Sequence, residues 1–218
     1  MAVIIGLGHP RCGTGFATHL LIENGFKVAH EKIAPDGIVS WMQAARRGPS
    51  PWGTTFTEYP ENSKIFLVAR SPLAALNSVA TESREYRSIG FRSQVIWDRC
   101  GIDIFAWNQQ TSPPRTYDFF GWGVMSLAYW YEICFQERPE MIFRVDREQD
   151  DQLLSNFLGK EITREGKKIW RNEKPGIKKL EYSIEELARV PKQHLNQLIN
   201  VSELLGYPDD AEIMRRFL

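Results

Sequence analysis

The chain has 218 residues, of which 43% are hydrophobic and 25% are charged, and it contains seven Trp, seven Tyr and twelve Phe. This composition excludes a disordered tail, a collagen-like repeat and a coiled coil, and the length favours one compact domain over residues 1–218. Because 27 Lys and Arg residues balance 27 Asp and Glu residues, no overall positive field would attract nucleic acid or an anionic membrane. Any anion-binding site must therefore be local.

The cysteines and the first residues indicate the compartment. Cys12, Cys100 and Cys134 lie far apart without a CxxC pair, so neither a disulfide framework nor a zinc site is indicated. The apolar run from Ala2 to Leu7 is too short and wrongly flanked for a signal peptide, and no apolar stretch of about 18 residues follows. We therefore expect a soluble, cytoplasmic protein without a membrane span. The sequence does not indicate an oligomeric state.

The first part of the chain alternates between strand and helix patterns. Apolar and β-branched runs predict strands over residues 3–5, 26–29 and 65–69. Apolar residues at helical spacing predict one helix over 16–21 and another over 38–45. Ser71 and Pro72 predict the N-cap and the first residue of a third helix.

The second part continues the alternation. Residues 84–114 are irregular and polar, which predicts a substrate lid or rim. An internal helix is expected over 121–135 and a strand over 141–145, followed by a helix that ends at Gly159 and by further helices up to Gly206. The alternation predicts a three-layer α/β fold of the P-loop type, with a central, mainly parallel sheet and a helical C-terminal part.

The loop between the first strand and its helix has the composition of an anion site. In Gly8–Gly15, the position of the P-loop lysine holds Thr14, and the position of the magnesium-binding Ser or Thr holds Gly15. A dinucleotide fingerprint would need its third glycine where Arg11 stands. Arg11 and the first amides of the helix could instead bind an anion without a metal. The alternative is a tight turn whose Arg faces solvent.

This loop resembles that of a known enzyme family. Pro10–Gly15 (PRCGTG) is similar to the 5′-phosphosulfate loop of the sulfotransferases, which bind 3′-phosphoadenosine 5′-phosphosulfate (PAPS). Their 3′-phosphate motif, an Arg that ends a strand and a Ser eight residues later, is matched by Arg70 and Ser78. The stretch from His30 to Trp41 also resembles short microbial and viral members. The resemblance implies donor contacts from Pro10, Arg11, Cys12, Gly13, Thr14, Gly15 and Phe16.

The second motif also has a physical basis. Arg70 follows a core strand, at the edge where open α/β sheets bind ligands. Helical spacing places Ser78 on the face of its helix away from the core, so it could reach a phosphate. The alternatives are that Arg70 forms a structural salt bridge at the end of the strand and that Ser78 is an ordinary surface residue. Arg171 and Lys174 lie where the family often places a basic loop over the 3′-phosphate, although a solvated charge run explains them equally well.

Two candidate bases follow the second predicted strand. His30 and Glu31 fall at the same carboxyl edge as the loop, and only one of them should face the donor. The resemblance to the carbohydrate-modifying branch implies Glu31 as the base, with its pKa moved toward neutrality by a dry site, and His30 as its partner or the alternative. A solvated turn residue is the structural alternative for Glu31. Arg11 would contact the bridging and sulfuryl oxygens, and Thr14 the 5′-phosphate.

The resemblance thus implies in-line transfer of a sulfuryl group from PAPS to a hydroxyl or amine of a small molecule or glycan, leaving 3′,5′-ADP, without a metal. Gly15 and Cys12 depart from the family loop, which has hydroxyl residues there. Trp122 and Trp130 should be core residues, whereas the Arg92–Trp107 region should contribute to the acceptor side. The rival interpretations are a nucleotide kinase-like enzyme with a deviant loop and a non-catalytic nucleotide-binding module.

Overall fold

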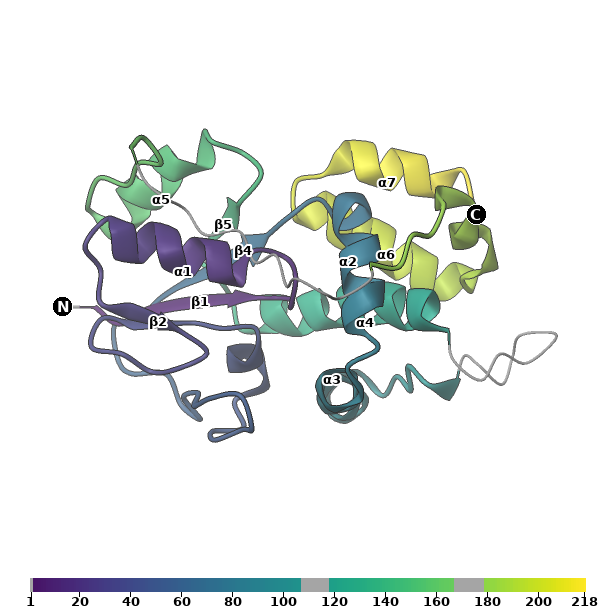
Figure 1. Cartoon of the computed structure of the whole chain (residues 1–218), viewed down its shortest axis with the longest axis horizontal. Helices are drawn as coiled ribbons and strands as arrows, with labels where there is room; N and C mark the ends of the chain where they lie inside the picture. Colours follow the sequence, from purple (N-terminus) through teal and green to yellow (C-terminus); the bar gives the residue numbers. More distant parts are fainter. Residues whose placement is uncertain (1, 107–117, 167–178) are drawn as a thin grey trace. The chain divides into compact units, whose positions relative to one another are not determined.

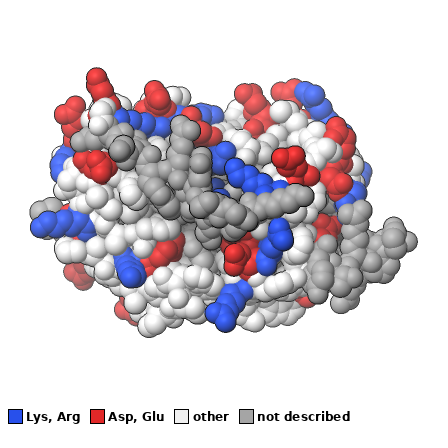
Figure 2. All heavy atoms as spheres, viewed as in Figure 1, with Lys and Arg blue, Asp and Glu red and all other residues white. Residues whose placement is uncertain are grey.

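The computed structural model describes residues 2–106, 118–166 and 179–218 (Figure 1). Within it the chain forms two compact units, the first comprising Met1–Arg70 with Cys134–Gly176 and the second Ser71–Ile133 with Ile177–Leu218. The single domain over residues 1–218 stays a prediction. Acidic and basic side chains are interspersed on the face that Figure 2 shows, as the balanced composition leads one to expect.

The first unit is built on a five-stranded sheet in which all strand pairs are parallel. In spatial order its strands are β2 (Val28–His30), β3 (Gly37–Val39), β1 (Ile4–Gly8), β4 (Lys64–Ala69) and β5 (Met141–Arg144). The predicted α/β fold with a central parallel sheet is confirmed. Because the strands are parallel, their carboxyl ends all lie at one edge of the sheet, which is where ligands bind in such folds.

Apolar side chains bury both faces of this sheet. Helices α1 (Thr14–Glu23) and α5 (Asp150–Leu158) pack on one face (Figure 1). The core there is formed by apolar residues of the sheet, the two helices and the segment after α5, including Ile4, Ala17, Leu20, Val39, Phe66, Val68, Phe143, Leu154 and Ile162. Ile5, Leu7 and Leu67, which alternate with the residues of that face, are also fully buried. Burial on both faces fixes the strand ends that carry the candidate site.

The connections that leave β1 and β4 run to opposite sides of the sheet. From β1 the chain continues through α1 to β2 on one side of the sheet, whereas β4 is followed in the sheet by β5 on the other side. The two strands are hydrogen-bonded neighbours, with Gly8 opposite Val68. In open α/β sheets, the point at which connections leave adjacent strands in opposite directions is the usual ligand site.

The second unit is helical. Its elements are α2 (Pro72–Glu82), α3 (Tyr86–Cys100), most of α4 (Phe119–Gln136), η3 (Ile184–Arg189), α6 (Lys192–Leu204) and α7 (Pro208–Arg215). The Ser71 hydroxyl accepts a hydrogen bond from the Ala74 amide, and Pro72 is the first residue of α2, so the predicted helix start is confirmed. Trp122 and Trp130 are buried core residues, as expected. The predicted helical C-terminal part is also confirmed.

Two predicted elements are wrong. Residues 38–45 form the end of β3 and the short helix η1 (Met42–Ala45) rather than one helix. Gly37 brings this strand against β1, because a Cβ at Gly37 would lie 1.9 Å from the Ile4 carbonyl oxygen. The segment predicted to be irregular from residue 84 contains α3. Its buried stripe includes Arg92, a charged residue that interrupts the apolar pattern.

Arg92 is fully buried in an ion pair within the second unit. Its side chain is 0% exposed and donates to both carboxylate oxygens of Glu82, at 3.2 and 2.6 Å, and to the hydroxyls of Ser88 and Ser126 at 2.8 and 2.7 Å. A side chain so placed stabilises the helices and does not face an acceptor. Arg92, the first residue of the region predicted to contribute to the acceptor side, is therefore a buried structural residue, and the contribution of the rest of that region stays a prediction.

Removing this guanidinium should destabilise the protein strongly. We expect Arg92→Ala to lower the free energy of unfolding by about 3–5 kcal/mol, because Glu82 would be left as a largely buried charge without its partner. Arg87, which is exposed on the same helix, provides the control, and Arg87→Ala should change the free energy by less than about 0.5 kcal/mol. Urea unfolding of both variants checks this. If the free energy of unfolding fell by a similar, small amount in both variants, the structural role of Arg92 would be contradicted.

Candidate functional site

The carboxyl edge of the sheet carries the candidate residues of the first unit. Arg11 follows β1 and Arg70 follows β4, so the two arginines come after neighbouring parallel strands at the same edge. His30 and Glu31 stand at the end of β2, and Ser40 follows β3. The topology therefore brings the predicted phosphate loop, the predicted base and one of the two residues predicted for the 3′-phosphate to one edge.

The loop after β1 leads directly into α1. Arg11 has a φ of 69° and Gly13 a φ of 103°, which turn the chain so that the first helical hydrogen bond runs from the Ala17 amide to the Gly13 carbonyl. No side chain caps this helix, and the amides of the first turn have no helical acceptor. Together with the helix dipole they favour an anion at this position.

The buried side chains of the loop are structural. Cys12 is 0% exposed, with its sulfur 4.0 Å from His9 Nδ1, and His9 Nδ1 donates to the Pro10 carbonyl oxygen at 2.6 Å. The Cys12 thiol thus points into the protein, and only its backbone could serve an anion.

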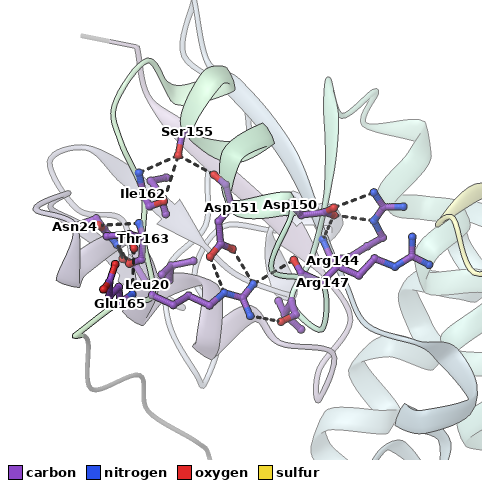
Figure 3. A network of polar contacts seen from close by, with 12 residues as sticks. Leu20, Asn24, Arg144, Arg147, Asp150, Asp151, Ser155, Ile162, Thr163 and Glu165 are labelled. Carbon is purple, nitrogen blue, oxygen red and sulfur yellow. Dashed lines mark hydrogen bonds and ion pairs between the residues drawn. The ribbon is translucent and has the colours of Figure 1, made fainter.

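A network of ion pairs and hydrogen bonds joins β5, α5 and the segment that follows α5 (Figure 3). Arg164 forms two hydrogen bonds of 2.7 Å with the carboxylate of Asp151 and donates to the Val145 carbonyl at 3.0 Å. Its guanidinium lies 4.9 Å from the centre of the Phe16 ring. Val145 in turn packs on Gly13, where a Cβ would come within 2.7 Å of the Val145 methyl groups. Sequence reasoning missed Arg164, because its contacts are distant along the chain.

Two arginines at the carboxyl edge differ in their pairing. Arg144, the last residue of β5, donates to Asp150 from Nε at 2.7 Å and from a terminal nitrogen at 3.0 Å (Figure 3). Arg70 is partly exposed, and within the described part of the chain its side chain makes no hydrogen bond or ion pair. Arg70 could therefore bind a ligand anion, whereas the Arg144 guanidinium is already paired with Asp150.

Glu31 is a buried carboxyl group held by its neighbours. Its exposed fraction is 8%, Ser40 Oγ donates to its Oε2 at 2.5 Å, and the Trp41 amide also donates to it. Burial raises the pKa of Glu31 from 4.5 to about 7, against the lowering effect of these two hydrogen bonds. Glu31 is therefore a buried carboxyl group whose pKa lies near neutrality, and its role as the base stays a prediction.

The backbone of Glu31 is held in an unusual conformation. Its φ is 62°, which a residue with a side chain adopts at a cost of about 1–3 kcal/mol. The Thr54 amide donates to the Glu31 carbonyl at 3.1 Å, and Gly53 lies so close that a Cβ there would be 1.7 Å from the same oxygen. Strained residues cluster at functional sites, and Arg11 in the facing loop is another of them.

His30 links Glu31 to the phosphate loop. Its Nε2 lies 3.0 Å from Glu31 Oε1 and 3.2 Å from Thr14 Oγ1, and its side chain is 38% exposed. Burial, and to a lesser degree the nearby His19, lowers the pKa of His30 from 6.5 to about 4. Because this value is below that of Glu31, the two do not form a charged pair near neutral pH.

The remaining predicted residues are not placed relative to this edge. Ser78 is partly exposed on α2, in the second unit, as its helical spacing predicts. Arg171, Lys174 and Trp107 lie outside the described residues. Sequence reasoning missed Ser40 because β3 was not recognised as a strand. Once β3 is known, Ser40 is the residue expected at its carboxyl end.

Comparisons with protein-family models, with curated proteins and with solved structures find no match to this chain. Among residues 2–106, 118–166 and 179–218, no group of three His, Cys, Asp or Glu side chains is placed to hold a metal ion. Within the same residues, every helix is too short or too polar to cross a membrane. A function must therefore be argued from the geometry of the site and the loop motifs.

Proposed function

We propose that the chain is a sulfotransferase that transfers a sulfuryl group from PAPS to a hydroxyl or amine of a small molecule or glycan, leaving 3′,5′-ADP. The observation that carries the proposal is the shared sheet edge. There an uncapped helix start with Arg11, an Arg70 that follows the neighbouring strand and is unpaired among the described residues, and a buried, near-neutral Glu31 occur together. This combination suits a donor with two phosphate groups and an acceptor that must lose a proton.

The loop residues fit the needs of the transferred group. In an in-line transfer, negative charge grows on the oxygen that bridges the sulfuryl group and the 5′-phosphate. Arg11 and the first-turn amides of α1 can stabilise this charge, because fixed donors in a partly dry site act more strongly than water does. Thr14 is mostly buried, with its hydroxyl toward His30, so its amide is the more direct contact to the 5′-phosphate.

Arg70 supplies the proposed specificity for the 3′-phosphate. Its guanidinium, which makes no hydrogen bond or ion pair with the described residues, can form two charge-assisted hydrogen bonds to a phosphate monoester. The resemblance implies Ser78, eight residues further along the chain, as a second donor. The absence of a lysine and of a magnesium-binding hydroxyl from the loop argues against the kinase-like alternative.

Arg70→Ala tests this assignment by calorimetry with 3′,5′-ADP and with 5′-AMP. We expect the wild type to prefer the bisphosphate by about 10- to 100-fold, the value of a charge-assisted hydrogen-bond pair, and the variant to lose most of this preference. Lys27 is exposed and precedes β2, at the opposite edge of the sheet, so Lys27→Ala is the matched charge control and should behave like wild type. Equal binding of both nucleotides by the wild type would overturn the assignment of Arg70.

Turnover separates the rival interpretations. A sulfotransferase consumes PAPS in the presence of an acceptor, a kinase-like enzyme consumes ATP with magnesium, and a non-catalytic module binds 3′,5′-ADP without consuming either. A panel of glycan and small-molecule alcohols and amines, assayed with labelled PAPS and separately with ATP and magnesium, and combined with 3′,5′-ADP binding, therefore decides among the three.

A further inference from the structure

The two oxygens of the Glu31 carboxyl group have different surroundings. Ser40 Oγ accepts a hydrogen bond from the Met42 amide at 3.0 Å and directs its own proton to Glu31 Oε2 at 2.5 Å. Within the described residues the Ser40 hydroxyl has no other acceptor. Oε2 is therefore an acceptor only, and a proton that Glu31 gains must bind to Oε1.

Oε1 lies beside His30. This oxygen is buried, lies 3.0 Å from His30 Nε2, and forms no aligned hydrogen bond with any described residue. Thr14 Oγ1 lies 3.2 Å from the same ring nitrogen. A relay that activates Thr14 as a nucleophile would need the carboxyl group and the hydroxyl at opposite ring nitrogens. The geometry therefore does not make Thr14 a nucleophile.

The free ring nitrogen is His30 Nδ1. No described residue bonds to it, and the His30 side chain is 38% exposed. When Glu31 is ionised, the ring proton is favoured on Nε2, which lies 3.0 Å from the charged Oε1, and Nδ1 keeps a lone pair. When Glu31 is protonated at Oε1, it donates to Nε2 and the ring proton moves to Nδ1.

We propose that His30 contacts the acceptor and takes its proton on Nδ1, while the proton on His30 Nε2 passes to Glu31 Oε1. The inference rests on the proposed sulfotransferase function and assigns different roles to the two candidate bases. His30 is the catalytic residue that meets the acceptor, Glu31 stores the proton, and Ser40 is a positioning residue that selects Oε1. Catalytic hydrogen bonds are often loose without substrate, and the Nε2 to Oε1 contact tightens when the acceptor binds.

The step is balanced in atoms and electrons. The acceptor O–H or N–H bond breaks as its oxygen or nitrogen bonds to the sulfur, and the bridging S–O bond breaks with its electron pair going to the 5′-phosphate of 3′,5′-ADP. An Nδ1–H bond and an Oε1–H bond form, and the Nε2–H bond breaks, so the ring ends neutral. The lowered pKa of His30 agrees with this, since the ring does not retain a positive charge. His19 is the other titratable group that acts on the ring.

Nitrogen NMR of the histidine ring in the full chain tests the relay without any nucleotide. Between about pH 5 and pH 9, His30 should change from the Nδ1–H form to the Nε2–H form with a midpoint near the Glu31 value of about 7. Glu31→Gln should abolish this change. Ser40→Ala should raise the midpoint by about one pH unit, because it removes a hydrogen bond to the charged carboxylate. Ser40→Thr, which keeps the hydroxyl, should restore the midpoint.

Ser202→Ala is the matched control, because Ser202, like Ser40, is 0% exposed, and its hydroxyl donates to the Leu198 carbonyl of its own helix rather than to a carboxylate. It should leave the His30 midpoint unchanged. The relay is overturned if His30 becomes an imidazolium near its ordinary value of 6.5 and Glu31→Gln leaves its ring form unaffected. The NMR test of the relay does not depend on nucleotide binding. The relay can therefore fail while the preference for 3′,5′-ADP holds, and the preference can fail while the relay holds.

Discussion

Glu31→Gln is expected to lower the rate of sulfuryl transfer by about 10²- to 10⁴-fold, the usual contribution of a positioned acid–base group. The amide has almost the same shape as the carboxylate and can still accept the Ser40 hydrogen bond, but it cannot take up a proton. The affinity for 3′,5′-ADP should not change, because Glu31 is not assigned to the nucleotide. Initial rates with labelled PAPS and calorimetry with 3′,5′-ADP measure the two effects.

The same substitution should stabilise the protein at high pH. The folded pKa of Glu31 is about 7 and its ordinary value is 4.5, so between these values the folded state binds a proton that the unfolded chain has lost. The free energy of unfolding therefore falls as the pH rises through this window. The difference between the two pKa values corresponds to about 3 kcal/mol. We expect the free energy of unfolding of Glu31→Gln to exceed that of the wild type by this amount at about pH 8 and to equal it at about pH 4.

His30 contributes the opposite slope at lower pH. Its folded pKa is about 4 and its ordinary value 6.5, so its contribution to stability rises with pH through that window. The two slopes partly cancel in the wild type, and only the difference between wild type and Glu31→Gln isolates the carboxyl group. Urea unfolding at several pH values measures it. Glu58→Gln, at an exposed position, should match the wild type in rate and stability. A Glu31→Gln enzyme with full turnover would remove Glu31 from the reaction.

The edge of the sheet could be predicted because the signals for its strands are local. Apolar runs mark β1, β4 and β5. β1 ends at Gly8, and β4 is followed, after Arg70, by the N-cap Ser71. Because these strands are parallel, the residues that follow them all lie at the carboxyl edge of the sheet. The placement of Arg11 beside the strand of Arg70 thus followed from the chain order and from the fold class alone.

The surroundings of Glu31 could not be predicted, because they depend on contacts between distant segments. β3 has three residues, and its neighbours Trp41, Met42 and Ala45 repeat at helical spacing, so a helix fitted the pattern better. The contact of Gly53 with Glu31 has no local signal. Residue 53 must be glycine because a side chain there would collide with the carbonyl oxygen of Glu31, 22 positions earlier in the chain. Patterns in a sequence show which face of an element is apolar, but they do not show which loop closes over it.

This contact leads to a second strong prediction. Gly53→Ala is expected to reduce sulfuryl transfer by about 10²-fold, the cost of displacing a catalytic group by about 1 Å. A Cβ on residue 53 would lie 1.7 Å from the Glu31 carbonyl oxygen, so either the turn from Ser50 to Gly53 or Glu31 must move. Crowding of this kind also costs about 1–3 kcal/mol of stability. Steady-state rates and urea unfolding measure both effects.

Gly90→Ala is the matched control for Gly53→Ala. Gly90 lies within α3, and a Cβ there would meet nothing within 4 Å, so the substitution should stabilise the helix by about 0.5–1 kcal/mol and leave transfer unchanged. Gly53→Ala should retain its affinity for 3′,5′-ADP, because Arg11 and Arg70 follow β1 and β4, which the turn does not hold. A variant that binds the nucleotide normally but transfers slowly would locate the defect at Glu31. A Gly53→Ala enzyme with undiminished turnover would mean that the strained backbone of Glu31 does not position the group that accepts the proton.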